Sequence, residues 1–373
     1  MPKVMVFAGT TEGMYVFESD ARRTRWRRHG PYLKRVSVNH FAWDLRAKTV
    51  YAATFDDGLA ATRNFGRTWT PLNDGLPIRK VWAVAVNPRN PNDLWAGTHF
   101  SYLFRSADRG RTWKLHMGYL SAPGKEQRYG DWGFGTTGNA LHGIHFDPKN
   151  AKRMIIVSST DHGAVRTLDG GDTWEFARRG VIEFCPAAER SLLSKPSDEE
   201  RVKSLQAHLD QVHACTHRIG ISPAAPNVVY RQQHCGVYRS EDFGANWQDI
   251  SEGLPDRHGF PLAVHPRDTN TVFVVPAYQG KGCKRHNSCI IGALDVYRSR
   301  TGGQTWEKLS EGLPRKVHCV VLRHGMDADS LKPAGVYFGT TTGELYGSAD
   351  EGNTWMLLGK RLPRVQGVAV AVV

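Results

Sequence analysis

One position recurs in seven successive segments of the chain and is histidine in four of them. When each segment is aligned by its distance from the turn that follows, the position falls at His40, Trp82, His142, His217, Phe260, His318 and Gln366. Prolines six residues later support the alignment at Pro88, Pro148, Pro223 and Pro266. Neutral imidazole is a common ligand of Fe, Cu, Zn and Ni ions. We therefore predict one divalent transition metal held by four ligands: His40, His142, His217 and His318.

Further His and Asp residues are expected in the turns between the second and third strands of these segments. Those turns contain Asp56, Asp57, His99, Asp161, His162, His234 and Cys235. Three of them, Asp161, His162 and His234, are candidates for a general acid, a general base or partners that orient the metal ligands. The predicted substrate pocket is lined by Trp82, His99, Trp132, Phe260 and Gln366.

The turn that sets the alignment is an eight-residue motif, Ser-x-Asp-x-Gly-x-Thr-Trp. It occurs, with small departures, at residues 106–113, 167–174, 240–247 and 348–355, and degenerate copies end at Trp69, Trp306 and Trp26. The Asp side chain can accept hydrogen bonds from backbone N–H groups, the Gly permits positive φ, and the Trp supplies a large apolar surface. The motif predicts a tight turn between two antiparallel strands.

This motif resembles the Asp-box, or BNR, repeat of sialidases, sortilin-type domains and Ycf48-type assembly factors. The resemblance covers nearly the whole chain and implies an all-β fold, a seven-bladed β-propeller. Short apolar strands alternate with turns between the motifs, which predicts four-stranded antiparallel blades. The apolar segment Val365–Val373 is expected to complete the N-terminal blade, which begins at Val4, and so to close the ring. We predict one domain over residues 1–373.

In a propeller the first strand of each blade lines the central channel, so the recurring position should form a ring at the channel mouth. The inferred layout is similar to the four-histidine iron centre of carotenoid-cleaving oxygenase propellers, which lack the Asp-box. We expect Fe or Cu, with Zn as an alternative, and oxidative or hydrolytic chemistry on a small molecule. Water that satisfies the rings of a polar channel mouth would explain the same histidines without a metal.

Three insertions should emerge at the same end of the propeller and cover the channel mouth. They span residues 119–139, 181–214 and 277–293. In the second insertion, Ser197 and Glu200 form a capping box before an apolar pattern at helical spacing. The apolar residues are Val202, Leu205, Leu209 and Val212. This pattern predicts a short amphipathic helix that acts as a lid.

The chain is basic, with a formal net charge of +13 and a pI near 9.5. This balance favours an anionic substrate or an acidic protein partner, with Arg22–Arg28 as the densest basic run. A solvated blade edge explains the same run, and no recognised motif supports nucleic-acid binding. No leader or long apolar segment is expected, and six cysteines in this length fit a reducing compartment. The predicted localisation is cytoplasmic, without membrane contact.

Two other functions remain open from the sequence. Sialidase-type sites need an Arg triad, which we cannot assemble, and ordinary glycosidases need two carboxyl groups across the scissile bond. A carbohydrate site is nevertheless possible through Trp82, Trp132 and the Asp residues of the turns. The other alternative is a noncatalytic assembly scaffold, which would bind no metal and would tolerate replacement of the histidines.

Overall fold

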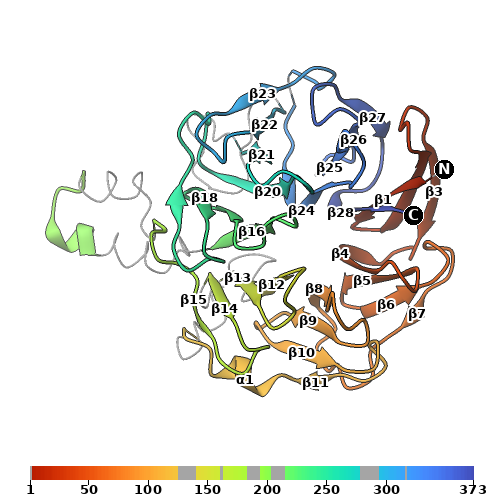
Figure 1. Ribbon diagram of the computed structural model, residues 1–373, viewed down its shortest axis with the longest axis horizontal. Helices are drawn as coiled ribbons and strands as arrows, with labels where there is room; N and C mark the ends of the chain where they lie inside the picture. The colour runs from red at the N-terminus through yellow and green to blue at the C-terminus, as the bar shows by residue number, and fades with distance from the viewer. Residues whose placement is uncertain are drawn as a thin grey trace.

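The computed structural model describes residues 2–124, 140–159, 163–182, 194–202, 215–277, 294–315 and 317–373. Within them the strands form five four-stranded sheets and one eight-stranded sheet. The eight-stranded sheet consists of two blades joined by a single parallel bridge between His324 and Gly367. The described strands therefore group into seven antiparallel blades around a centre (Figure 1). This arrangement confirms the predicted all-β propeller.

The blades are numbered here in chain order, and their strands are given from the innermost outward. Blade 1 consists of β28 (Val365–Val372), β1 (Lys3–Thr10), β2 (Gly13–Asp20) and β3 (Arg27–Tyr32). Blade 2 consists of β4 (Ser37–Asp44), β5 (Thr49–Phe55), β6 (Gly58–Thr62) and β7 (Thr70–Pro71). Blade 3 consists of β8 (Val81–Val86), β9 (Leu94–Thr98), β10 (Leu103–Ser106) and β11 (Lys114–Leu115), and helix α1 (Met117–Leu120) follows it.

The remaining blades repeat the same order. Blade 4 consists of β12 (Leu141–Phe146), β13 (Met154–Ser158), β14 (Ala164–Thr167) and β15 (Glu175–Phe176). Blade 5 consists of β16 (Thr216–Ile221), β17 (Val229–Gln233), β18 (Gly236–Ser240) and β19 (Gln248–Asp249). Blade 6 consists of β20 (Gly259–Val264), β21 (Val272–Pro276), β22 (Val296–Ser299) and β23 (Glu307–Leu309). Blade 7 consists of β24 (Val321–Ala328), β25 (Val336–Thr340), β26 (Leu345–Ser348) and β27 (Met356–Gly359).

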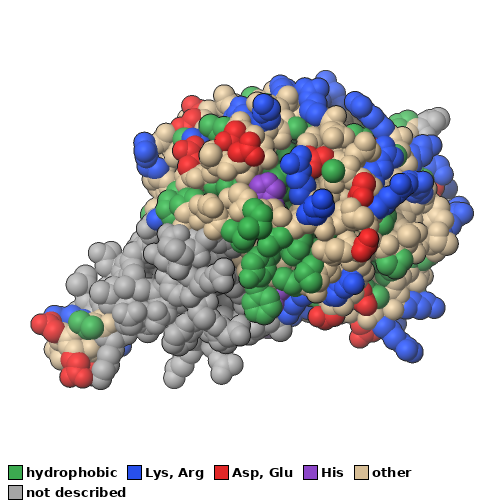
Figure 2. Space-filling view, turned by 90° about the horizontal axis from the view of Figure 1, so that it is seen from below, with side chains coloured by type: hydrophobic (Ala, Val, Ile, Leu, Met, Phe, Trp, Pro, Cys, Tyr) green, Lys and Arg blue, Asp and Glu red, His purple; other side chains and the backbone are tan. Residues whose placement is uncertain are grey.

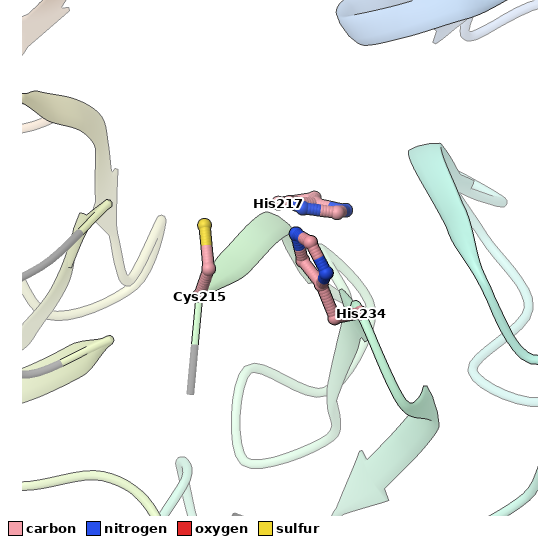
Figure 3. A group of neighbouring side chains, drawn as sticks. All are labelled: Cys215, His217 and His234. Atoms are coloured by element: carbon pink, nitrogen blue, oxygen red, sulfur yellow. The ribbon is translucent and has the colours of Figure 1, made fainter. Parts of the chain in front are cut away.

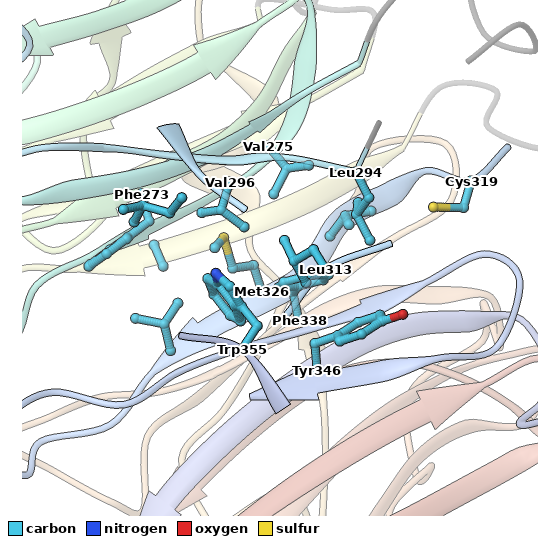
Figure 4. Close-up of a cluster of buried hydrophobic side chains, with 14 residues drawn as sticks. Phe273, Val275, Leu294, Val296, Leu313, Cys319, Met326, Phe338, Tyr346 and Trp355 are labelled. Carbon is cyan, nitrogen blue, oxygen red and sulfur yellow. The ribbon is translucent and has the colours of Figure 1, made fainter. Parts of the chain in front are cut away.

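The core is divided into seven buried clusters, each lying between two consecutive blades. Between blades 6 and 7, for example, Phe273 and Val296 pack with Phe338 and Trp355 (Figure 4). Second strands such as β13 are buried along their whole length, because each blade has a neighbour on both faces. The innermost strands contact one another in the order β4, β8, β12, β16, β20, β24, β28 and back to β4. The ring is therefore closed.

Strand β28 makes this closure by pairing with β1, as the sequence predicts. The pairing runs from Val4 opposite Val372 to Gly9 opposite Gly367. Lys3 and Val373 also exchange two backbone hydrogen bonds, of 2.8 and 2.9 Å. The two ends of the chain consequently lie side by side in blade 1 (Figure 1).

The repeated turns make the hydrogen bonds expected of the Asp-box. In the turn after β10, the Thr112 N–H donates to Asp108 Oδ1 over 2.9 Å, and Gly110 has a φ of 83°. The indole N–H of Trp113 donates to the carbonyl of Leu72 in the preceding blade over 3.0 Å. The motif therefore closes a turn within one blade and also ties that blade to its neighbour.

We expect the folded protein to lose stability in acid, because the carboxylates of the box turns become protonated there. The N–H and hydroxyl of Thr112 donate to Asp108 and lower its pKa from 3.8 to about 2, and the Thr173 hydroxyl is the largest cause of a similar lowering at Asp169. Because these folded pKa values lie below the unfolded ones, their stabilisation is complete above about pH 4 and disappears as the pH falls through about 2. Thermal unfolding followed across this range should show the loss.

The variant Asp108→Asn should unfold with a weaker pH dependence than the wild type. Asparagine keeps the acceptor oxygen without the titration, as Asn64 does naturally when it accepts from the Thr68 N–H over 3.0 Å. Asp172→Asn is the matched control, because Asp172 is an exposed residue of another box turn whose side chain is not the box carboxylate. An unchanged pH profile in Asp108→Asn would contradict this account.

Parts of two predicted lids lie among the described residues. Helix α1 begins the first insertion, and in the second the Glu200 N–H donates to Ser197 Oγ over 3.2 Å. The Arg201 N–H donates to the Ser197 carbonyl over 3.0 Å, which is the predicted start of a helix. The rest of its apolar pattern, Leu205, Leu209 and Val212, lies outside the described residues, as does the third insertion beyond Ala277.

Across the described ranges no helix has the length and apolar character needed to cross a membrane.

Candidate functional site

A β-bulge interrupts the innermost strand of each blade near its start. In β8, for example, Val81 pairs with Thr98 and Ala83 with Gly97, so Trp82 between them has no partner residue. The same interruption occurs at Asn39, His142, His217 and Gln366, and in β20 it spans Phe260 and Pro261. In β24 the bulge is wider and spans residues 322–325. At Trp82, His142, His217, Phe260 and Gln366 the recurring position of the sequence therefore coincides with a bulge.

Two of the four predicted metal ligands do not occupy this position. His40 lies one residue after the bulge residue Asn39, and His318 lies before β24, ahead of the bulge at residues 322–325. The supporting prolines follow Trp82, His142, His217 and Phe260, all of which the structure places at bulges. The predicted alignment is wrong at His40 and His318, because loops and bulges of different width shift the spacing that it assumes.

At three bulges the side chain contacts the innermost strand of the next blade. These contacts, of 2.7, 2.6 and 2.5 Å, join Asn39 Nδ2 to the Trp82 carbonyl, Gln366 Nε2 to Ser37 Oγ, and His217 Nδ1 to the Gly259 carbonyl. A polar side chain at the bulge thus connects neighbouring blades. For Gln366, which was predicted to line a pocket, this contact is a structural role.

A group of basic side chains gathers near the axis. The ring centroids of His40 and His324 are 4.3 Å apart, those of His142 and His324 are 6.5 Å apart, and Arg218 Nη1 lies 2.8 Å from His324 Nδ1. Burial, followed by the charge of Arg218, lowers the pKa of His40 to about 3. Burial is also the largest cause that brings the pKa of His142 and of His324 well below the ordinary value. These rings are neutral at neutral pH.

The four predicted ligands do not come together in one metal site. Among the described residues, one group of three His, Cys, Asp or Glu side chains has ligand atoms close enough to hold a metal ion. It consists of Cys215, His217 and His234, whose ligand atoms all lie within 4.8 Å of one another (Figure 3). The ring of Phe260 stacks on His217 at a centroid distance of 4.5 Å. The sequence analysis identified both histidines of the group but not Cys215.

An aromatic and acidic patch lies at the same end of blades 2 and 3. The ring centroids of Phe55 and Trp82 are 4.5 Å apart, and those of His99 and Phe100 are 4.4 Å apart. Two turns meet here, because backbone hydrogen bonds of 2.8 and 2.9 Å join Gly58 to Arg79 and His99 to Lys80. Asp56 and Asp57 are exposed in the turn between β5 and β6. We call this surface the blade 2–3 patch and define it as Phe55, Asp56, Asp57, Trp82, His99 and Phe100.

Two residues of the blade 2–3 patch have positive φ, a conformation that Asp tolerates but that is unfavourable for Phe. Asp56 has a φ of 76° and Phe100 a φ of 62°, a region that is rarely occupied by bulky residues. Turn chemistry favours Gly or Asn at such positions. The Phe100 side chain is nevertheless 48% exposed, so core packing does not explain its presence. Backbone strain of this kind is found at binding sites and active sites, and in this chain also at Phe65 and Phe243 in the box turns.

Three predicted site residues, Trp132, Asp161 and His162, lie outside the described residues. Sequence reasoning missed Arg218, Cys215 and His324, which the fold places beside the predicted histidines. Arg218 and Cys215 flank His217 closely in the chain, so a search of both sides of each bulge would have found them. His324 lies inside the widened bulge of β24, and no pattern in the sequence predicts that bulge.

Comparison with known proteins supports the fold and identifies two related enzymes. The BNR-Asp box repeat model matches residues 237–250, which contain the turn between β18 and β19. The chain is 28% identical over 246 residues to a probable oligoxyloglucan-reducing end-specific xyloglucanase of Neosartorya fischeri. It is 22% identical over 242 residues to an oligoxyloglucan-reducing end-specific xyloglucanase of Emericella nidulans. Each alignment covers 61% of this chain but 27% of the relative, so the chain spans about a quarter of their length.

Two solved structures have similar folds. An ancestral GH74 enzyme aligns with a TM-score of 0.61 and 19% identity, over 86% of this chain and 38% of that chain. Ycf48 bound to a D1 peptide aligns with a TM-score of 0.54 and 13% identity, over 91% of this chain and 93% of that chain. The Asp-box match and the two structural alignments agree with the repeated turns and with the β-propeller fold described above.

Proposed function

We propose that the protein is a glycoside hydrolase that binds an oligosaccharide on the blade 2–3 patch and cleaves a glycosidic bond there. The observation that carries this proposal is the 28% identity over 246 residues to a probable xyloglucanase. The names of both curated relatives point to xyloglucan oligosaccharides as the class of substrate. These relatives favour the carbohydrate alternative of the sequence analysis over metal-dependent oxidative chemistry.

The chemistry of the blade 2–3 patch suits a sugar chain. Pyranose rings present C–H faces that pack on aromatic side chains, and their hydroxyl groups donate to carboxylates. The half-buried ring of Phe55 and the exposed ring of Phe100 offer apolar surfaces, and Asp56 and Asp57 offer acceptors beside them. Lys80, which lies 5.8 Å from the Phe55 ring centroid, adds a donor for hydroxyl oxygens. The patch therefore combines stacking surfaces with hydrogen-bonding groups of both kinds.

Hydrolysis by the common glycosidase mechanisms requires a carboxylic acid that protonates the leaving oxygen and a carboxylate on the other side of the bond. Asp56 and Asp57 are the carboxyl groups of the patch, and both are exposed to an incoming chain. In the proposed reaction one of them donates the proton and the other activates water or attacks the anomeric carbon. In this proposal the aromatic rings of the patch hold the sugar chain beside the two carboxyl groups, and the leaving sugar takes up the donated proton.

We expect the variant Phe100→Asn to bind xyloglucan oligosaccharides about five-fold more weakly than the wild type, since it removes a stacking surface worth about 1 kcal/mol. The same change should raise the melting temperature, because Asn adopts positive φ more readily than Phe. Isothermal titration calorimetry and thermal unfolding measure the two effects. A gain in stability together with a loss of affinity would identify Phe100 as a residue kept for binding.

The control for this experiment is Leu168→Asn. Leu168 is 51% exposed, compared with 48% for Phe100, and lies in the box turn after β14, at the opposite end of its blade. The control should bind oligosaccharides as tightly as the wild type. Equal affinities for Phe100→Asn and the wild type would place the sugar elsewhere and contradict the assignment of the patch.

A noncatalytic scaffold that docks an acidic protein is the second candidate. The basic run supports it, because Arg22, Arg25, Arg27 and Arg28 are exposed on the turn before β3 and on β3 itself, the outer edge of blade 1. Arg23 is instead buried and bound to Asp329 over 3.0 Å. Lys and Arg side chains are spread over the side of the molecule seen in Figure 2, with Asp and Glu among them. Charged residues on an edge strand also prevent edge-to-edge pairing, which explains the run without a partner.

A further inference from the structure

We infer that Cys215, His217 and His234 form a binding site for a zinc ion at the end of blade 5 where β16 begins. This site is separate from the blade 2–3 patch and does not depend on the proposed hydrolase function. It differs from the four-histidine site predicted from the sequence, because two of its three donors were not predicted as ligands. Its donor set is one thiolate and two imidazoles.

The local fold explains why these three side chains meet. Cys215 directly precedes β16 and His217 is its bulge residue, two positions further along, so both side chains emerge at the same end of the strand. Thr216 between them pairs with Gln233, and His234 follows Gln233 in the turn between β17 and β18. Figure 3 shows the three side chains gathered at this end of the blade. The site is therefore built at the start of β16 and in the turn that follows β17.

His217 carries the strongest indication of a ligand. Its Nδ1 lies 2.5 Å from the Gly259 carbonyl, and since a carbonyl only accepts, Nδ1 must carry the proton. Its Nε2 then has a free lone pair, yet this atom is buried without a hydrogen-bond partner in a residue that is 1% exposed. A backbone carbonyl that fixes one ring nitrogen while the other is left to a metal is the usual arrangement of metal-binding histidines. A bound ion would satisfy the buried nitrogen.

Geometry and charge are compatible with zinc. The three ligand atoms lie within 4.8 Å of one another, and a tetrahedral zinc site needs separations of about 3.4–3.6 Å, so small side-chain rotations suffice. Burial raises the pKa of the Cys215 thiol, and Arg323, within hydrogen-bonding reach, acts in the opposite direction. A coordinating thiol loses its proton to the metal, so the bound form would be the thiolate. The negative thiolate in turn offsets the repulsion between that guanidinium and the ion.

The donor set selects the metal. A thiolate with two imidazoles is a donor set typical of Zn²⁺, whereas carboxylate and water oxygens are preferred by Mg²⁺, Ca²⁺ and Mn²⁺. This choice differs from the Fe or Cu that four histidines predict. Three protein ligands leave the fourth tetrahedral position for a water molecule, which is the pattern of zinc sites that retain an open position.

The test uses full-length protein purified without an affinity tag, freed of metal by a chelator and titrated with Co²⁺ and Zn²⁺. We expect about one Co²⁺ per chain, with tetrahedral cobalt absorption and a thiolate-to-cobalt charge-transfer band, and displacement by Zn²⁺. Cys215→Ser should lose the charge-transfer band. Cys319→Ser, which alters another buried free cysteine in blade 7, should keep it.

A second variant keeps the test decisive if Cys215→Ser folds poorly. His234→Gln changes a half-buried turn residue and should weaken Zn²⁺ binding at least about ten-fold. Zn²⁺ should also raise the melting temperature of the wild type and of Cys319→Ser by more than that of His234→Gln. Failure of the wild type to take up stoichiometric metal, or an unchanged charge-transfer band in Cys215→Ser, would overturn the inference.

Discussion

Removal of β28 is expected to unfold the protein. Deletion of residues 365–373 takes away Val365 and Val368, which are 0% and 5% exposed, and leaves β1 without one of its two partner strands. Burial of two valines contributes about 3–6 kcal/mol, which is comparable with the roughly 5–15 kcal/mol stability of a whole domain. The deletion also breaks the contacts of β28 with β24 and β4, which hold the ring together. Circular dichroism and thermal unfolding should show the loss of a cooperative transition.

A deletion of equal length elsewhere provides the control. Residues 194–202 are nearly all exposed, so their removal should shift the melting temperature by only a few degrees. If the protein without residues 365–373 unfolded at the same temperature as the wild type, ring closure by β28 would not be the source of stability that the structure indicates.

The second large effect is on catalysis. The double variant Asp56→Asn, Asp57→Asn should reduce hydrolysis of xyloglucan oligosaccharides by at least about a thousand-fold, because it removes both proposed acid and base groups. The fold should survive the change. Asn adopts the φ of 76° found at Asp56 as readily as Asp does, and both side chains are exposed. The melting temperature should therefore stay close to that of the wild type.

The single variants Asp56→Asn and Asp57→Asn should show which residue is the acid and which is the base or nucleophile. The residue that protonates the leaving oxygen should matter less for substrates with a good leaving group, whereas the other should be needed for all substrates. Asp172→Asn again serves as a matched control, since it is an exposed carboxyl group in a box turn at the opposite end of blade 4. Full activity in the double variant would exclude this pair and move the search to other carboxyl groups.

The fold was predictable because its signal is local and repeated. Each box turn needs a side-chain acceptor, a residue that permits positive φ and an apolar anchor, and these needs are met within eight residues, as in Asp108, Gly110 and Trp113. Seven buried clusters between consecutive blades then follow from the repetition. Closure by β28 was also predictable from the repeats, because the apolar segment Val365–Val373 follows the last complete set of four strands and has no partner strands after it in the sequence.

The site was harder to predict because it depends on backbone irregularities. The alignment is correct at His142 and His217, where a proline marks the same spacing, and fails at His40 and His318, where none does. A one-residue difference at a bulge changes which side chain is unpaired, and distances counted along the sequence do not record it. The blade 2–3 patch was missed as a unit for another reason: its two turns meet through backbone hydrogen bonds to residues 79–80, which no side-chain pattern reveals.

Cleavage of an oligosaccharide on the blade 2–3 patch is the proposed activity of this protein. Its most direct test is mass spectrometry of xyloglucan oligosaccharides after incubation with the wild-type protein, alongside the Asp56→Asn, Asp57→Asn variant. The account predicts shorter oligosaccharides with the wild type and intact substrate with the variant. Intact substrate in both reactions, or the same products formed at the same rate in both, would contradict it.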